Sequence, residues 1–181
     1  KDEEERRKLT LVKVATLNDF YSTNIFDVFT VANHILQVPD LDSRLKEGDL
    51  SLVDEIRKVR IDGKDHDFYS FATKYCSHHN DTVFPIYDYY VDKILNEYRR
   101  GYGCLRDSLG GVGFKTAKDL RRPRGKEDEC SGYEIFKKAL EQLAKWFGLR
   151  WDKSLNLKEL DQYLWQLGKD LFPRSYSKKA K

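Results

Sequence analysis

The residue of this chain best placed for a chemical role is an aspartate that directly follows an aromatic segment. Asp88 follows Phe84-Pro85-Ile86-Tyr87 and precedes Tyr89 and Tyr90. Pro85 is predicted to stand in the first turn of a helix, where its fixed φ is tolerated. A carboxylate near a helix N-terminus is favoured by the helix dipole, so Asp88 could serve only as a cap. The alternative is a functional carboxylate at the mouth of a helix, beside aromatic rings.

Histidines and a cysteine gather just before this segment, at His66, Cys76, His78 and His79. Helical zinc ligands usually recur three or four residues apart, whereas adjacent His78 and His79 point about 100° apart on a helix. Cys76 with a neighbouring histidine is equally poor as a nucleophile pair, because adjacency in sequence is not catalytic geometry. The sequence therefore predicts no metal site and no cofactor. The histidines fit a helix C-terminus.

A glycine-rich stretch, Leu109–Ala117, precedes a basic cluster. Such a stretch can turn backbone N–H groups toward a phosphate, and a following helix N-terminus favours the anion. The stretch could equally be a flexible loop, and the basic cluster a solvated one. Alternatively, this part of the chain forms a surface that contacts phosphates. The candidate contact residues are then Lys115, Lys118, Arg121, Arg122 and Arg124.

Apolar residues at helical spacing predict the elements that position these side chains. Helices are expected over about 25–37, 51–59, 68–78, 85–100, 133–148 and 157–172, with a further buried segment at 9–17. Asp62-Gly63 indicates either a small hairpin or a turn between helices. The predicted fold is all-α, a single orthogonal bundle of about six or seven helices, with a long irregular basic loop near 101–132.

The composition fits one domain, because 40% of the 181 residues are hydrophobic, enough for one core. We expect that domain over 1–173 and a disordered basic tail over 174–181. The net charge of +3 permits a nucleic-acid partner without arguing for one. Three scattered cysteines fit a reducing compartment, no apolar run approaches the ~18 residues of a membrane span, and no signal-peptide pattern opens the chain. We expect a cytoplasmic protein with no membrane segment.

The segment Phe84–Val91 resembles the P-V-D-T-H-V stretch of the helix-hairpin-helix DNA glycosylases. In that family the stretch opens a helix and its aspartate is the catalytic carboxylate, a role that the resemblance gives to Asp88. Ser70 stands 18 residues ahead of Asp88, close to the spacing of the family's nucleophilic lysine or of the serine in adenine-removing members. Lys74 is one helical turn too close to be that lysine.

The chain also departs from the family's pattern. Residues 109–117 look like its L-P-G-V-G-x-x-T-A hairpin, but they follow Asp88, whereas the family places the hairpin first. Gly110 stands where proline is expected, and the family's four-cysteine cluster is missing. Three further stretches, F-A-T-K-Y-C, F-P-I-Y-D-x-Y-V and L-K-E-L-D-Q-Y-L-W-Q-L-G-K, look like small uncharacterised bacterial helical proteins. That resemblance implies no activity.

Two functions follow as hypotheses. The first is a DNA-binding protein related to base-excision glycosylases, in which Asp88, with Ser70, acts on an N-glycosidic bond at a flipped-out nucleotide. Tyr87, Tyr89 or Tyr90 would stack on a base, and Lys74 would join the basic loop in contacting the nucleic acid. The second is a non-enzymatic helical module that binds protein or nucleic acid, in which Asp88 is only a cap. The sequence alone does not decide whether the protein is an enzyme.

Overall fold

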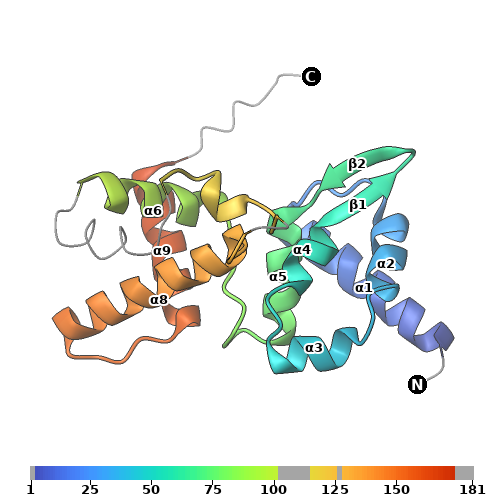
Figure 1. Cartoon of the computed structure of the whole chain (residues 1–181), viewed down its shortest axis with the longest axis horizontal. Coiled ribbons are helices and arrows are strands. Elements are labelled where there is room, and N and C mark those ends of the chain that lie inside the picture. Colours follow the sequence, from blue (N-terminus) through green and yellow to red (C-terminus); the bar gives the residue numbers. More distant parts are fainter. Residues whose placement is uncertain (1–2, 102–114, 126–127, 174–181) are drawn as a thin grey trace.

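The computed structural model describes residues 3–101, 115–125 and 128–173, and within them the fold is all-α apart from one two-stranded hairpin. The first half of the chain (right in Figure 1) forms one group of elements. They are α1 (Glu3–Tyr21), α2 (Val28–Leu36), α3 (Leu41–Glu47), α4 (Leu52–Arg57), β1 (Lys58–Ile61), β2 (Lys64–Asp67) and α5 (Tyr69–His79).

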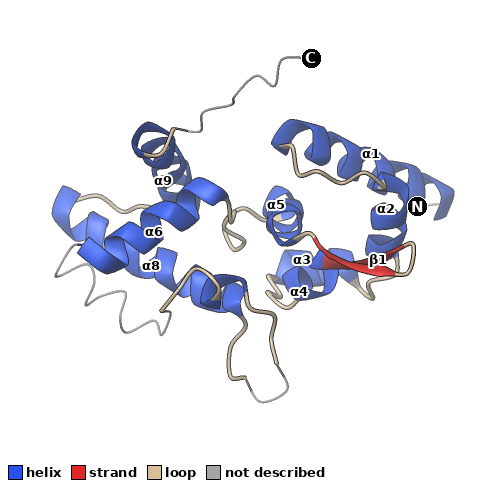
Figure 2. Cartoon of the chain, turned by 90° about the horizontal axis from the view of Figure 1, so that it is seen from above, coloured by secondary structure: helices blue, strands red, loops and turns tan. Residues whose placement is uncertain are grey.

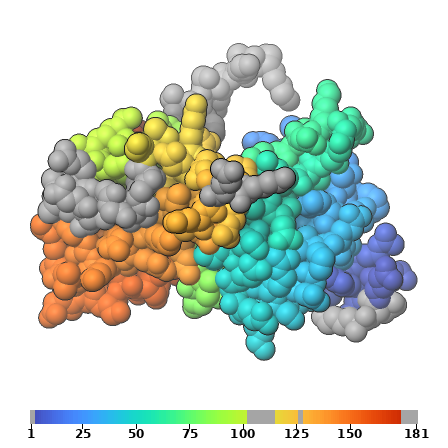
Figure 3. All heavy atoms as spheres, viewed as in Figure 1, coloured from blue at the N-terminus to red at the C-terminus, as the bar shows by residue number. Residues whose placement is uncertain are grey.

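The second half of the chain forms a group beside the first. Its elements are α6 (Tyr89–Gly101), the 3-10 turn η1 (Asp119–Arg121), α8 (Gly132–Trp151) and α9 (Leu157–Leu171). Figures 1 and 2 place this group next to the first, and Figure 3 shows the atoms of the two in contact. In Figure 2, α5 lies between α1 and the short helices α3 and α4, on the side toward the second half.

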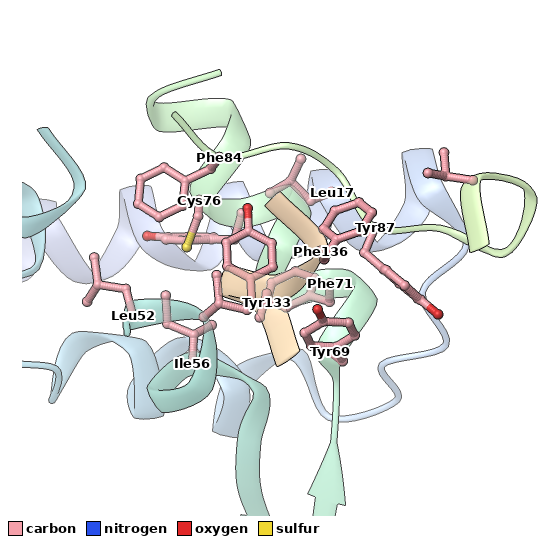
Figure 4. Close-up of a cluster of buried hydrophobic side chains, with 14 of the residues drawn as sticks. Leu17, Leu52, Ile56, Tyr69, Phe71, Cys76, Phe84, Tyr87, Tyr133 and Phe136 are labelled. Atoms are coloured by element: carbon pink, nitrogen blue, oxygen red, sulfur yellow. The ribbon is translucent and has the colours of Figure 1, made fainter. Parts of the chain in front are cut away.

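One hydrophobic core joins the two halves. Tyr69, Tyr87, Tyr133 and Phe136 pack with ring centroids 4.9–6.3 Å apart, although they come from both parts of the chain (Figure 4). Their hydroxyl groups are satisfied inside the protein: Tyr133 donates to the carbonyl of Pro85 at 2.8 Å and Tyr69 to that of Leu120 at 2.6 Å. Buried tyrosines need such partners, so these bonds fix how the second half sits on α5.

Two predicted helix starts are wrong. α6 begins at Tyr89, four residues beyond Pro85, because the carboxylate of Asp88 accepts from the backbone N–H of Val91 at 2.9 Å and its carbonyl accepts from Asp92. α2 begins at Val28 rather than near residue 25, because Asp27 caps it by accepting from Thr30 at 2.9 Å.

The Asp62-Gly63 signal marks a hairpin rather than a turn between helices. β1 pairs antiparallel with β2, with Ile61 opposite Lys64. Asp62 and Gly63 both have positive φ, of 48° and 76°, as a tight two-residue hairpin turn requires. The strand pattern escaped detection because β2 is exposed along its whole length and carries no apolar alternation.

The buried face of α9 differs from the face predicted by the helical spacing of its apolar residues, which are Leu160, Tyr163, Leu164, Leu167 and Leu171. Leu160, Asp161, Leu164 and Gly168 point inward, whereas Leu171 is 60% exposed. The close approach of α9 to α6 explains this, since Gly168 lies against the backbone of Tyr90. Asp161 was missed for the same reason.

The irregular loop predicted near 101–132 is seen only in part. Residues 115–125 and 128–131 hold the short η1 turn and otherwise no regular element; residues 102–114, with the glycine-rich stretch, lie outside the described residues, as does the predicted tail 174–181. Along the described ranges, no helix combines the length and apolar character needed to cross a bilayer. The single domain over 1–173 stays a prediction.

We expect Gly168→Ala to destabilise the protein by about 1–3 kcal/mol, as overpacking of a filled core does. An added Cβ would stand 2.6 Å from the Cβ of Tyr90 and 3.0 Å from its carbonyl oxygen, which would push α9 away from α6. Urea unfolding measures the effect. Gly101→Ala is the matched control, because among the described residues no atom beyond its chain neighbours and its own helix backbone lies within 4 Å of the added Cβ. Equal stability of the two variants would contradict the close packing.

Candidate active site

Two adjoining cavities, of about 520 and 410 Å³, open where the two halves of the chain meet. Both are lined by Phe20, Tyr21, Lys74, Asp88 and Trp165. The first also touches Ser22, Thr23, Asn24, Ser70, Tyr87, Tyr89, Tyr90, Asp92 and Arg121, and the second Ile86, Lys158, Asp161 and Gln162. The two together are named the Asp88 pocket below. Each volume lies within the ~300–1,000 Å³ typical of small-molecule sites.

Asp88 is both a helix cap and a wall of this pocket. Its Oδ1 accepts from the N–H of Val91 at 2.9 Å, which holds the carboxyl group at the N-terminus of α6. The residue is half-buried and lines both cavities. The two roles that the sequence set against each other therefore coexist in one side chain.

Two hydroxyl groups of α5 hold the backbone that carries Asp88. The hydroxyl of Ser70 donates to the carbonyl of Tyr87 at 3.1 Å, and the N–H of Tyr87 donates to the hydroxyl of Thr73 at 3.1 Å. Both polar groups of the Tyr87 peptide are thus satisfied by one helix. This fixes the carboxylate against α5 without regular secondary structure in residues 84–88.

Lys74 is buried in the pocket wall rather than exposed at the surface. Its Nζ donates to the hydroxyl of Ser70 at 2.5 Å, and the side chain is 5% exposed. Because the proton of the Ser70 hydroxyl is directed at the carbonyl of Tyr87, Lys74 is the donor of this pair. Ser70 therefore positions the ammonium group, and its geometry is not that of a nucleophile activated by an amine.

The charge on Lys74 is balanced by carboxylates. Burial lowers the pKa of Lys74, while the negative charges of Asp88 and Asp161 raise it. The Nζ also lies 5.2 Å from the centre of the Tyr21 ring, a cation–π distance. With 5% of the residue exposed, Lys74 lies in the pocket wall, and its predicted contact with nucleic acid stays a prediction.

Asp161 is the member of the pocket that sequence reasoning missed. It is 7% exposed, and its Oδ1 has no hydrogen-bond partner in the part of the chain that the structure describes. Burial raises the pKa of Asp161 to about 7, and the nearby charge of Asp88 adds to the rise. The available signal was an aspartate between Leu160 and Leu164 on one helical face, where an apolar residue is expected.

Tyr21 lines the Asp88 pocket beside Lys74, and it contacts His78, which lines a separate hollow. The hydroxyl of Tyr21 and Nε2 of His78 are 2.9 Å apart. Burial lowers the pKa of His78 and raises that of Tyr21. Both are therefore neutral at pH 7, and the phenol donates to the imidazole nitrogen.

The three predicted base-stacking tyrosines differ in position. Tyr87 is 5% exposed, its ring packs in the core, and its hydroxyl donates to Asp92 at 2.6 Å, so its ring is not placed to stack on a base. Tyr89 is 41% exposed and Tyr90 is half-buried, and both line the pocket. Two further aromatic side chains, Phe20 and Trp165, are 75% and 41% exposed at the same pocket.

The predicted phosphate-contacting residues are exposed, but only one of them lines the Asp88 pocket. Arg121 does so, and with Lys118 it also lines a neighbouring hollow of about 350 Å³. Lys115 lies further along the loop. Arg122 is paired with Asp128 at 2.5 Å, and Arg124 approaches Glu134 at 3.9 Å.

The histidine and cysteine cluster does not converge on a site. Burial raises the pKa of the Cys76 thiol well above its ordinary range, and its sulfur lies in the core (Figure 4). His79 bonds the carbonyl of Tyr75 and the Nζ of Lys13. Among the described residues, no three His, Cys, Asp or Glu side chains gather in a way that could hold a metal ion.

A larger hollow, of about 690 Å³, lies where α8 turns into α9. The charged side chains along it, Glu141, Lys145, Asp152 and Lys153, are exposed to solvent. The Asp88 pocket, with its buried ammonium and carboxyl groups, is the better candidate for an active site.

We expect Asp161→Asn to stabilise the protein above pH 7 and to leave it unchanged below about pH 4. A carboxyl with its pKa raised from 3.8 to about 7 on folding stabilises the native state at low pH, and this stability is lost as the pH rises through that window. The neutral amide removes the loss, which is at most ~4 kcal/mol. Urea unfolding at several pH values measures it.

Asp170→Asn is the control, because Asp170 is an exposed aspartate of the same helix. It should not change the pH dependence. An Asp161→Asn variant less stable than the wild type at pH 8 would show that the carboxyl is ionised there at no cost.

Comparison with known proteins finds similarity to one domain family and to one bacterial protein. Residues 2–83 match the model of the HI_0787_N family, described as an N-terminal domain. The chain is 46% identical over 158 residues to a Haemophilus influenzae protein named "Uncharacterized protein", and the match covers 87% of this chain and 65% of that protein. The chain thus spans less than two thirds of the length of this relative. No solved structure matches it.

The expected likeness to uncharacterised bacterial proteins is confirmed by this relative. Neither match names a DNA glycosylase. The region matched by the family model contains Ser70 and Lys74 and ends before Asp88, so the Asp88 pocket combines residues from within that N-terminal domain with residues beyond it. This chain is therefore similar to the HI_0787_N domain family over its first 83 residues, and the pocket lies at the border of that similarity.

Proposed function

We propose that this protein binds DNA and hydrolyses the N-glycosidic bond of a nucleotide flipped into the Asp88 pocket, as helix-hairpin-helix DNA glycosylases do. The observation that carries the proposal is the position of Asp88. Its carboxyl group caps α6 and at the same time lines a cavity between the two halves of the chain. The resemblance of residues 84–91 to the glycosylase segment gives the aspartate the same place at the start of a helix.

A negative charge beside the sugar favours cleavage of the N-glycosidic bond. As the C1′–N bond breaks, positive charge develops on the sugar ring, and a fixed carboxylate stabilises it. The backbone N–H of Val91 orients Asp88 before substrate arrives, so the group need not reorganise during the reaction. The same carboxylate can accept a proton from the attacking water.

Aromatic rings at the pocket support recognition of a base. Phe20, Tyr89 and Trp165 expose between 41% and 75% of their surface there. Stacking on such rings contributes about 1–3 kcal/mol per base and tolerates any base. A nucleobase leaving the duplex would find flat apolar surfaces before it reaches the buried charges.

Arg121 links the pocket to the basic loop. It lines both the Asp88 pocket and the hollow that contains Lys118, so a strand whose base enters the pocket could lay its phosphates along these cations. Arg122 and Arg124 have acidic neighbours, and we assign them a smaller share of the binding. Ser70 positions the segment that carries Asp88 by bonding the carbonyl of Tyr87. Lys74 balances the charge of Asp88.

We expect Asp88→Asn to abolish base excision, with at least a ~100-fold loss of rate, while the cap of α6 is kept. Asparagine caps helices as well as aspartate does, so only the charge is lost. Single-turnover assays on duplexes with damaged or mismatched bases, followed by detection of the free base, measure the rate.

Asp27→Asn is a matched control, because Asp27 caps α2 through the same bond to the third following N–H, outside the pocket. It should keep full activity. Equal activity of Asp88→Asn and the wild type would remove Asp88 from the mechanism. If neither protein releases a base, the non-enzymatic module is the better account.

Binding of duplex DNA should weaken steeply with salt, because each phosphate contact releases counterions. We expect Lys118→Gln and Arg121→Gln each to reduce the slope of log K against log salt by about 1. Fluorescence anisotropy from low to moderate salt gives the slope. Lys145→Gln, on the distant α8 surface, should leave the slope unchanged, and a slope near zero in the wild type would argue for a protein partner.

A further inference from the structure

A second carboxyl group, that of Asp161, faces the same pocket from α9. The residue is 7% exposed and shares the inward face of the helix with Leu160, Leu164 and Gly168. It lines the cavity that also contains Asp88 and Lys74. Packing alone does not call for a carboxylate there.

The carboxyl group is also incompletely satisfied. Its Oδ1 is buried and has no hydrogen-bond partner among the described residues. A buried polar atom without a partner costs about 1–3 kcal/mol, so native structures rarely leave one unpaired. A ligand atom in the cavity could accept a proton from this group or donate one to it.

Charged and titratable groups from every neighbouring element set the protonation of Asp161. Burial and the charge of Asp88 raise its pKa to about 7, while Lys158 on α9 and Lys74 on α5 oppose the rise. Burial is the main cause that raises the pKa of Tyr21 on α1 and of Tyr133 on α8, and the charge of Asp161 adds to both rises.

His78, also on α5, bonds Tyr21 and stays neutral at pH 7, because burial and Lys158 lower its pKa. It therefore adds no positive charge near Asp161 at neutral pH. A substantial fraction of Asp161 then carries a proton that it can transfer.

We propose that Asp161 is the general acid of the reaction and protonates the departing nucleobase, while Asp88 stabilises the sugar. This rests on the proposed function and deepens it. Two carboxyl groups with separated roles are a known solution for breaking glycosidic bonds. Lys74 interacts electrostatically with both carboxyl groups, and the proton stays on Asp161 because burial and the charge of Asp88 outweigh the opposing effect of Lys74.

The step is balanced in atoms and electrons. The C1′–N bond breaks and its electron pair goes to the base, which takes the proton of the Asp161 carboxyl group on a ring nitrogen or an exocyclic oxygen. Water then bonds to C1′ and its proton passes to Asp88. Both aspartates return to their starting states by exchanging protons with solvent.

The assignment specifies the substrate class. A neutral base is a poor leaving group and gains from protonation, whereas a purine that is already cationic, such as N7-methylguanine, gains little. The pocket is therefore built for neutral bases. General acid catalysis typically contributes ~10²–10⁴-fold to such a step.

The test compares excision of a neutral base and of N7-methylguanine from the same duplex by the wild type and by Asp161→Asn. We expect the variant to lose at least ten times more rate on the neutral base than on the cationic one. The wild-type rate on the neutral base should fall above about pH 7, the pKa of the group, and this fall should be missing from the variant. Asp170→Asn, an exposed aspartate of the same helix, should behave as the wild type.

Equal losses on the two bases, or no loss on either, would overturn the general-acid role. If the wild type excises the cationic base and Asp161→Asn loses no more rate on the neutral base than on the cationic one, only the general-acid role is contradicted. A wild type that excises neither base sinks the proposed function as well. Unfolding curves of Asp161→Asn show that a lost rate does not come from a lost fold.

Discussion

The buried ammonium group of Lys74 is the constraint around which the site is organised. An ion withdrawn from water must be compensated by opposite charge and by hydrogen bonds. Here the compensation comes from Ser70 on the same helix, from the Tyr21 ring at the end of α1, and from the charges of Asp88 and Asp161. These groups belong to both halves of the chain, so the cation ties the halves together and the Asp88 pocket forms where they meet.

The backbone that carries Asp88 is fixed by three hydrogen bonds from neighbouring helices. Ser70 and Thr73 satisfy the carbonyl and the N–H of Tyr87, and Tyr133 satisfies the carbonyl of Pro85. A segment without helix or strand is thereby held rigidly between α5 and α8, and Asp88 starts α6 from a defined point. The same carboxyl group caps α6 and lines the pocket, which is why a structural and a functional role need not compete.

Much of the fold could be predicted, because buried leucines, isoleucines and aromatic residues recur at helical spacing in α5, α6 and α8. Helix starts were less predictable. Asp27 and Asp88 decide them through single side-chain bonds, which the spacing of apolar residues does not reveal. Of the residues that the sequence singled out, Ser70, Lys74 and Asp88 line one cavity. Asp161 was not found, because the inward face of α9 is set by the contact of Gly168 with Tyr90 across 78 residues of sequence, and no local pattern contains that contact.

The most direct test of the central claim is the affinity for two duplexes that differ only at one abasic position. One carries a pyrrolidine, whose positive charge imitates the sugar as the bond breaks, and the other a neutral tetrahydrofuran. If Asp88 and the buried charges around it are arranged to stabilise that positive charge, the protein will bind the pyrrolidine duplex at least ~10-fold more tightly, about 1.4 kcal/mol, and Asp88→Asn will lose the preference. Equal affinity of the wild type for both duplexes would contradict the account.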